Sequence, residues 1–140
     1  MYKNLVETAH EEGFKAVVVE ALACKEDGQV LLLEDLQGSD RFYHFPYAEL
    51  KEGETLPQAI QRALIMTAAL HIKEVRRFLG HYDREGRRYL NFVVEVSDPY
   101  AVEENKGISF AWLDIQEAVG YPIHDETRGM LDLFAKTQLG

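Results

Sequence analysis

The segment from residue 45 to residue 72, FPYAELKEGETLPQAIQRALIMTAALHI, constrains the fold more than any other part of the chain. A polar loop over 46–54 leads into a predicted helix over 55–68. Thr55 is a suitable N-cap for this helix, and Pro57 lies in its first turn, where a proline is tolerated. Apolar side chains recur along one side of it, at Leu56, Ile60, Ala63, Leu64 and Leu70. The helix must therefore pack that side against another layer of structure.

Strands are predicted on both sides of this helix. Residues 14–24, FKAVVVEALAC, have the composition of a buried strand, and 29–36, QVLLLEDL, form its hairpin partner after a turn that ends at Gly28. Further strands are predicted over 72–83, 87–97 and 108–114, an acidic loop over 98–107, and helices over 2–12, 115–119 and 125–137. The order of elements favours an α+β fold, with a mixed sheet between helical layers.

The size and charge of the chain limit the classes of function. A chain of 140 residues forms one domain, 1–140, with room for a core. No apolar run is long enough to cross a bilayer and the N-terminus is polar, so we expect a cytoplasmic protein with no membrane contact. The formal charge of −9 opposes binding to nucleic acid. We interpret one interrupted basic cluster as a solvated surface in preference to a phosphate site: Arg76, Arg77, Arg84, Arg87 and Arg88.

The chain resembles the Nudix hydrolase superfamily over nearly its whole length. Three segments carry the resemblance: the hairpin KAVVVEALACKEDGQVLLLED, the 45–72 segment and FAWLDIQEA near the C-terminus. The 45–72 segment has the outline of the Nudix box, commonly written G-x5-E-x7-R-E-U-x-E-E-x-G-U, where U is a bulky aliphatic residue. The resemblance implies a Nudix-type α/β/α sandwich with a mixed sheet. It also implies Mg²⁺-dependent cleavage of a nucleoside diphosphate linked to another group.

The outline of the box is kept, but its metal-binding residues are replaced. Glu54, Arg62, Leu64 and Leu70 match the pattern. The two glycine positions hold Ala48 and Ala69, and three acidic positions hold Ala63, Met66 and Thr67. Those three positions share one helix face, where carboxylates could converge on Mg²⁺, whereas a methyl, a thioether and a hydroxyl offer no such site. We therefore predict no catalytic residue, no metal ligand in the box and no cofactor.

A ligand pocket can outlast the loss of the metal, and we predict one between the first strand and residues 42–47. The candidate ligand-binding residues are Glu20, Phe45, Tyr47, Glu54 and Arg62. Glu20 is a lone charge in an apolar strand and should face a cleft or a partner, because burying it alone is costly. Aromatic rings at 42–47 could stack on a base; in the alternative interpretation, which we favour slightly, Phe42 and Phe45 are core and Tyr43 and Tyr47 lie at the surface. Glu54 is interpreted as a helix cap or a residual ligand, and Arg62 as a partner of a loop carboxylate or of an anion.

Three functions are compatible with these features. The first is a Nudix-fold protein that has lost Mg²⁺-dependent hydrolysis and binds a nucleotide, a small phosphorylated ligand or a protein partner. The second is a hydrolase of nucleoside diphosphate derivatives with a displaced Mg²⁺ site, for which the candidate carboxylates are Glu49, Glu52, Glu103 and Glu104. The third is a structural module, such as a homodimer. The altered box favours the first or third function, and the aromatic cluster favours the first.

Overall fold

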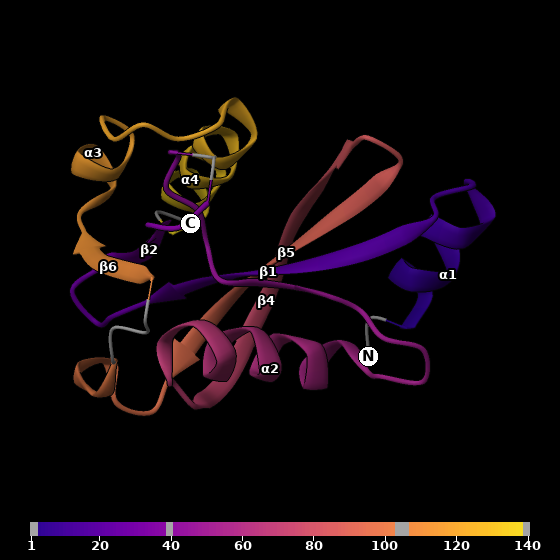
Figure 1. The fold of residues 1–140 in the computed structure, drawn as a ribbon, viewed down its shortest axis with the longest axis horizontal. Coiled ribbons are helices and arrows are strands. Elements are labelled where there is room, and N and C mark those ends of the chain that lie inside the picture. Colours follow the sequence, from indigo (N-terminus) through magenta and orange to yellow (C-terminus); the bar gives the residue numbers. More distant parts are fainter. Residues whose placement is uncertain (1–2, 39–40, 103–106, 139–140) are drawn as a thin grey trace.

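In the computed structural model, which describes residues 3–38, 41–102 and 107–138, a mixed sheet lies between two helical layers (Figure 1). The strands are β1 (Ala16–Cys24), β2 (Val30–Asp35), β3 (Tyr47–Glu49), β4 (Ile72–Arg84), β5 (Arg87–Val96) and β6 (Ile108–Leu113). The helices are α1 (Lys3–Glu11), α2 (Leu56–Ala68), α3 (Ile115–Ala118) and α4 (Asp125–Gln138), with a 3-10 turn η1 (Pro99–Ala101). None of these helices is long and apolar enough to cross a membrane.

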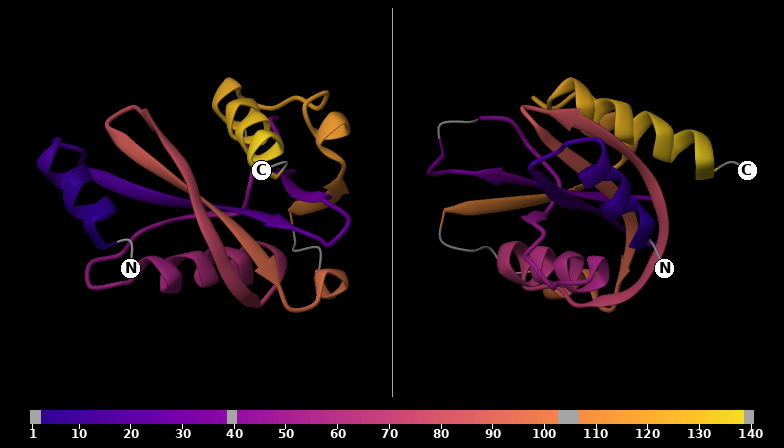
Figure 2. Two further views of the ribbon diagram at one scale, coloured as in Figure 1. Left: turned by 180° about the vertical axis from the view of Figure 1, so that it is seen from behind. Right: turned by 90° about the vertical axis from the view of Figure 1, so that its right-hand side faces the viewer.

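The strand order is β4-β5-β1-β2-β6, and β3 pairs with β1 beside this path. β1 runs parallel to β5, while the other pairs are antiparallel. The side view in Figure 2 shows α2 on one face of the sheet and α4 on the other. The α+β class and the α/β/α sandwich with a mixed sheet are therefore confirmed.

The core divides into two clusters because successive strand residues point to opposite faces of the sheet. Val19 and Ala21 of β1 belong to the cluster under α2, whereas Leu22 belongs to the cluster under α4. The predicted buried side of α2 is confirmed, since Leu56 is 4% exposed and Ile60 and Leu64 are fully buried. Glu20 alternates with Val19 and Ala21, so it lies on the α4 face.

The predicted helices and strands are present, with ends that differ by at most two residues. The prediction of a continuous loop over 46–54 is wrong, because β3 lies within it. Glu49 of β3 pairs with Val18 of β1, and Tyr47 pairs with Glu20. A three-residue strand that directly follows a proline is too short to show a period-2 pattern in the sequence. β3 fixes the first half of this loop against the centre of the sheet.

Candidate functional site

The start of α2 is fixed by a capping box. The Thr55 hydroxyl accepts a hydrogen bond from the Gln58 backbone N–H at 3.3 Å, and the Gln58 side chain accepts one from the Thr55 N–H at 2.9 Å. Thr55 is therefore the N-cap, as predicted. The interpretation of Glu54 as the helix cap is wrong, because the capping hydrogen bonds are made by its neighbour.

Glu54 and Arg62 instead bind each other. Arg62 Nε donates to Glu54 Oε2 at 3.0 Å, and Arg62 Nη2 donates to Oε1 at 2.9 Å. Arg62 Nη2 also donates to the Glu49 carbonyl at 2.6 Å, and the Lys51 N–H donates to Glu54 Oε1 at 3.0 Å. These hydrogen bonds, led by those from Arg62, hold the pKa of the Glu54 carboxyl below its usual value. The pair fastens the 50–54 loop to α2, so both side chains are already engaged within the protein.

The helix face that would carry the metal ligands presents no carboxylate. Ala63 is 1% exposed and packs in the core, while Met66 is 66% exposed. The Thr67 hydroxyl donates to the Ala63 carbonyl of its own helix at 2.6 Å. Within the described parts of the chain, no three Asp, Glu, His or Cys side chains gather closely enough to hold a metal ion. The residues present do not fit the Mg²⁺ of a Nudix box.

Of the four carboxylates named for a displaced metal site, two lie within the described residues. Glu49 makes an ion pair with Arg87 at 3.2 Å. Glu52 is exposed in the turn of the loop, and Glu103 and Glu104 lie outside the described residues.

The two alanines at the glycine positions of the box behave differently. Ala48 is in extended β3, opposite Val19, and needs no special backbone conformation. Ala69 has φ 58° and ψ 30°, a left-handed conformation in which its N–H bonds the Ile65 carbonyl. α2 therefore ends as it would with a glycine, although alanine is disfavoured there. The loop itself turns at Gly53, with φ 79°.

A cavity of about 230 Å³ lies on the α4 face of the sheet, at the predicted position between β1 and the 42–47 segment. We refer to it as the Glu20 cavity. Its lining residues are Glu20, Asp35, His44, Tyr47, Tyr82, Arg84, Arg87, Tyr89, His124 and Thr127. Two of the candidate ligand-binding residues, Glu20 and Tyr47, are thus brought together, whereas Glu54 and Arg62 do not line the cavity.

The floor of the Glu20 cavity is polar. Glu20 is 5% exposed and accepts a hydrogen bond from the Tyr82 hydroxyl at 2.7 Å. Burial raises the pKa of Glu20, and the Tyr82 hydrogen bond opposes that effect only in part. Asn91 lies opposite Glu20 on β5 and is fully buried. Its hydrogen-bonding interaction with the Glu20 carboxyl also works against the rise in the Glu20 pKa that burial causes.

The aromatic cluster ahead of the box is divided between core and cavity. Phe45 is fully buried in the cluster under α4, so its prediction as a ligand-contacting residue is corrected to a core residue. Tyr47 is 51% exposed and packs edge-on against His44 in the wall of the Glu20 cavity, with ring centroids 5.3 Å apart. The α4 cluster needs a large apolar side chain where β2 meets the 42–47 segment, and Phe45 fills that space.

Seven lining residues were not predicted, and four of them lie on the β4–β5 hairpin: Tyr82, Arg84, Arg87 and Tyr89. They alternate on both strands of the β4–β5 hairpin, so they share the face of the sheet that carries Glu20. Tyr82 and Tyr89 stack in parallel, with centroids 4.8 Å apart and planes 7° apart. The sequence does contain a symmetric pattern about the turn: a tyrosine and an arginine two residues apart precede it, and an arginine and a tyrosine two residues apart follow it.

No family model and no curated protein matches the sequence. Solved structures do match. The MutT structure described for Aliivibrio salmonicida and Vibrio cholerae superposes with a TM-score of 0.77 at 16% identity, over 86% of this chain and 98% of that one. The Escherichia coli ORF135 protein superposes with a TM-score of 0.71 at 21% identity, over 88% of this chain and 90% of that one. A NUDIX hydrolase from Nitrosomonas europaea superposes with a TM-score of 0.70 at 21% identity, over 87% of this chain and 89% of that one.

The chain has the Nudix fold. At these identities the likeness concerns the fold alone, and activity must be argued from the site.

Proposed function

We propose that this Nudix-fold protein binds a nucleotide-like, phosphorylated ligand in the Glu20 cavity and does not carry out Mg²⁺-dependent hydrolysis. The observation that carries the proposal is the combination of a box helix without carboxylates and a separate polar cavity on the other face of the sheet. The first feature argues against turnover, and the second supports binding. Both features lie in the same domain, on opposite faces of the sheet.

The absence of carboxylates on α2 bears directly on catalysis. Cleavage of a diphosphate requires that its clustered negative charge be neutralised, and electrostatic stabilisation of this kind is usually the largest part of enzymatic rate enhancement. Glu54 cannot replace the missing ligands while both of its oxygens accept hydrogen bonds from Arg62. We expect the loop and α2 to act as a scaffold that holds β3 and Tyr47 beside Glu20.

The Glu20 cavity supports binding of a planar polar group. Tyr47 and His44 supply ring surfaces, and Glu20 supplies a buried hydrogen-bonding group. Its volume of about 230 Å³ is below the ~300–1,000 Å³ typical of pockets for drug-sized ligands. The cavity therefore suits a single ring system, with the remainder of the ligand at its mouth.

The test combines thermal unfolding with an activity assay. Nucleosides and nucleotides are screened for a rise in melting temperature, with Mg²⁺ and separately with EDTA, since binding to the native state raises stability. The same preparations are assayed for hydrolysis of nucleoside triphosphates, ADP-ribose and dinucleoside polyphosphates. We expect stabilisation that EDTA does not remove and no hydrolysis above background. Turnover that EDTA abolishes would overturn the proposal in favour of a displaced metal site. No stabilisation by any ligand would contradict the binding role.

A further inference from the structure

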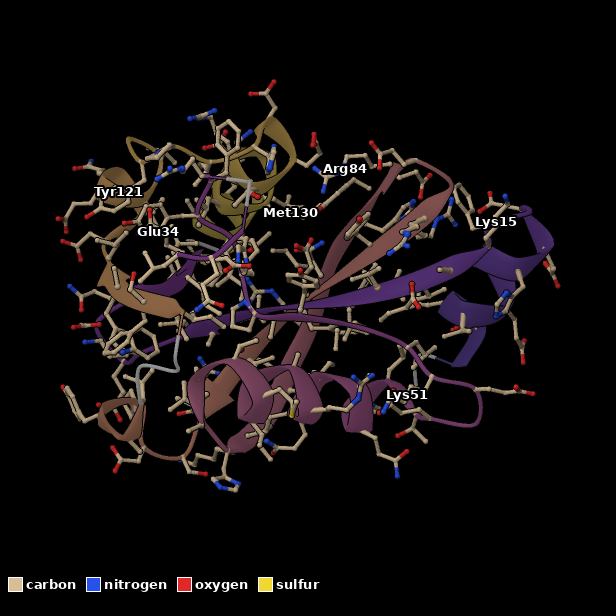
Figure 3. All side chains as sticks on the ribbon, viewed as in Figure 1. Lys15, Glu34, Lys51, Arg84, Tyr121 and Met130 are labelled. Carbon is tan, nitrogen blue, oxygen red and sulfur yellow. The ribbon has the colours of Figure 1, made fainter. Side chains whose placement is uncertain are left out.

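We infer that Arg84 and Arg87, at the tip of the β4–β5 hairpin, bind the anionic group of the ligand at the mouth of the Glu20 cavity without a metal ion. This inference rests on the proposed function, because it assigns the anion position within the same cavity. Figure 3 shows Arg84 on the hairpin, on the side of α4, and Lys51 of the box loop beside α2. The anion would therefore bind away from the box helix.

The two arginines face each other across the hairpin. Arg84 is the last residue of β4, Arg87 is the first of β5, and their Cα atoms are direct partners in the antiparallel register. Two like charges in directly opposite positions destabilise a strand pair. An anion bound between the guanidinium groups would offset that repulsion.

The turn that joins them is also unfavourable in its own right. Glu85 adopts φ 55° and Gly86 adopts φ 78°. Gly86 tolerates this conformation, but Glu85 occupies a left-handed position that a tight hairpin turn normally gives to Asn, Asp or Gly. The strain is confined to Glu85, because positive φ at both central residues is what a two-residue hairpin turn of this kind requires.

Each guanidinium retains binding capacity. Arg84 Nη1 lies 3.3 Å from Glu126 Oε1, and Arg87 Nη1 lies 3.2 Å from Glu49 Oε1. Arg84 also has a side-chain hydrogen bond with Tyr89. These contacts use part of each guanidinium, which has five N–H donors in a fork that fits carboxylate and phosphate groups. The Arg84 guanidinium also lies over the Tyr89 ring, 5.3 Å from its centroid, which orients it along the cavity wall.

The other arginines of the cluster have different positions. Arg88 is 7% exposed and is bound by Asp83 and Glu12. Arg77 donates to the Thr137 hydroxyl at 2.5 Å. Arg76 pairs with Glu74 at 3.6 Å and does not line the Glu20 cavity. The cluster predicted as one solvated surface thus contains two cavity residues, Arg84 and Arg87, and three residues in other environments.

Arg76 provides a matched control for the experiment. Its side chain is 49% exposed, close to the 51% of Arg87, and it also makes an ion pair with a glutamate. The double variant Arg84→Gln/Arg87→Gln and the control Arg76→Gln are compared with the unaltered chain. Affinities for the nucleoside 5′-monophosphates and for the corresponding nucleosides are measured by calorimetry in EDTA. The single variant Arg87→Gln serves if the double variant does not fold.

We expect at least one monophosphate to bind about tenfold or more tightly than its nucleoside, as charge-assisted hydrogen bonds predict. The double variant should reduce that ratio to below about twofold, while Arg76→Gln should preserve it. Equal binding of nucleosides and monophosphates would overturn this inference and leave the proposed function standing. An equal loss of this affinity ratio in Arg76→Gln would also overturn the inference, since the effect would then come from the change in net charge and not from contact with the anion. Failure of every nucleoside and nucleotide to bind would overturn both proposals.

Discussion

Arg62 holds Glu54 at two points, with an Nε–Oε2 distance of 3.0 Å and an Nη2–Oε1 distance of 2.9 Å. This pair joins residues eight positions apart and fastens the box loop to α2. The carboxylate side chain is 13% exposed and that of the arginine 29%, so water screens the pair less than it screens a surface ion pair. In the absence of carboxylates at positions 63, 66 and 67, this contact has a structural role.

Arg62→Met should lower the free energy of unfolding by about 1–2 kcal/mol, because it removes the two hydrogen bonds from Arg62 to the Glu54 carboxylate and the one to the Glu49 carbonyl. Urea denaturation measures the change. Arg76→Met, which removes two long ion pairs of a half-exposed side chain, to Glu74 at 3.6 Å and to Glu95 at 3.9 Å, should change stability by less than about 0.5 kcal/mol. The pKa of Glu54 is depressed in the folded state, so the contribution should be complete above its unfolded value near ~4.3 and lost as the pH falls through the folded value. A loss that is unchanged in strong acid would contradict this account.

Ala69→Gly should stabilise the protein by roughly 0.5–1 kcal/mol, because it removes the Cβ from a left-handed position at the end of α2. Ala68→Gly, one residue earlier and within the helix, should instead destabilise by about 1 kcal/mol. Thermal unfolding of the two variants beside the unaltered chain gives both values. If the two changes have the same sign, the left-handed helix end is not present in solution.

Ala63 and Met66, at two positions of α2 that correspond to acidic residues in the Nudix box pattern, differ in exposure. Ala63→Glu would bury a carboxylate against the sheet, since Ala63 is 1% exposed, and should cost more than about 3 kcal/mol. Met66→Glu, at a side chain that is 66% exposed, should change stability by less than about 0.5 kcal/mol. Denaturant titration of the two single variants compares them directly. Equal effects would show that the face of α2 is oriented differently.

The sequence predicted the sandwich because the signals for it are local. The capping residues at Thr55 and Gln58, the apolar stripe of α2 and the alternation in β5 each act within a few residues. β3 was missed because it is held by pairing with β1, a contact between residues about 30 positions apart. Such pairing leaves little trace in three residues of sequence.

The candidate site was predicted only in part, for a related reason. Glu20 could be found because a charge inside an apolar strand stands out. The spacing of Arg84 and Tyr89 about the turn places them on one face of the hairpin, but the sequence does not show that this face lies beside the start of α4, where Arg84 contacts Glu126. Phe45 was predicted to contact the ligand because it lies close to Tyr47 in the sequence. The structure places Phe45 in the core and Tyr47 in the cavity wall, so closeness in the sequence did not mean a shared environment.

Alanine substitutions at Phe45 and Tyr47 distinguish the effect of losing a core side chain from the effect of losing a cavity side chain. Phe45→Ala should cost about 3–5 kcal/mol of stability, because a fully buried ring is removed. Tyr47→Ala should cost less than about 1 kcal/mol, since half of that side chain is exposed, yet weaken ligand binding more strongly. Stability by denaturant titration and ligand-induced shifts in melting temperature distinguish the two effects. A larger loss of binding in a stably folded Phe45→Ala protein would return Phe45 to the ligand site.

Glu20 should give the protein a pH dependence opposite in sign to that of Glu54. Burial raises the pKa of Glu20 in the folded state, so between the unfolded and folded pKa values the folded protein binds more protons than the unfolded chain. The free energy of unfolding should therefore fall as the pH rises from ~4.3 through the folded pKa of this group. Glu20→Gln keeps an acceptor for the Tyr82 hydroxyl and removes the charge. We expect the free energy of unfolding of this variant not to fall over this pH range. At neutral pH it should be higher than that of the unaltered chain by about 1 kcal/mol or more. Urea titrations from pH 4 to pH 8, with Glu52→Gln as the exposed control, measure it. A Glu20→Gln profile that follows the unaltered chain throughout would mean that Glu20 is solvated in the free protein.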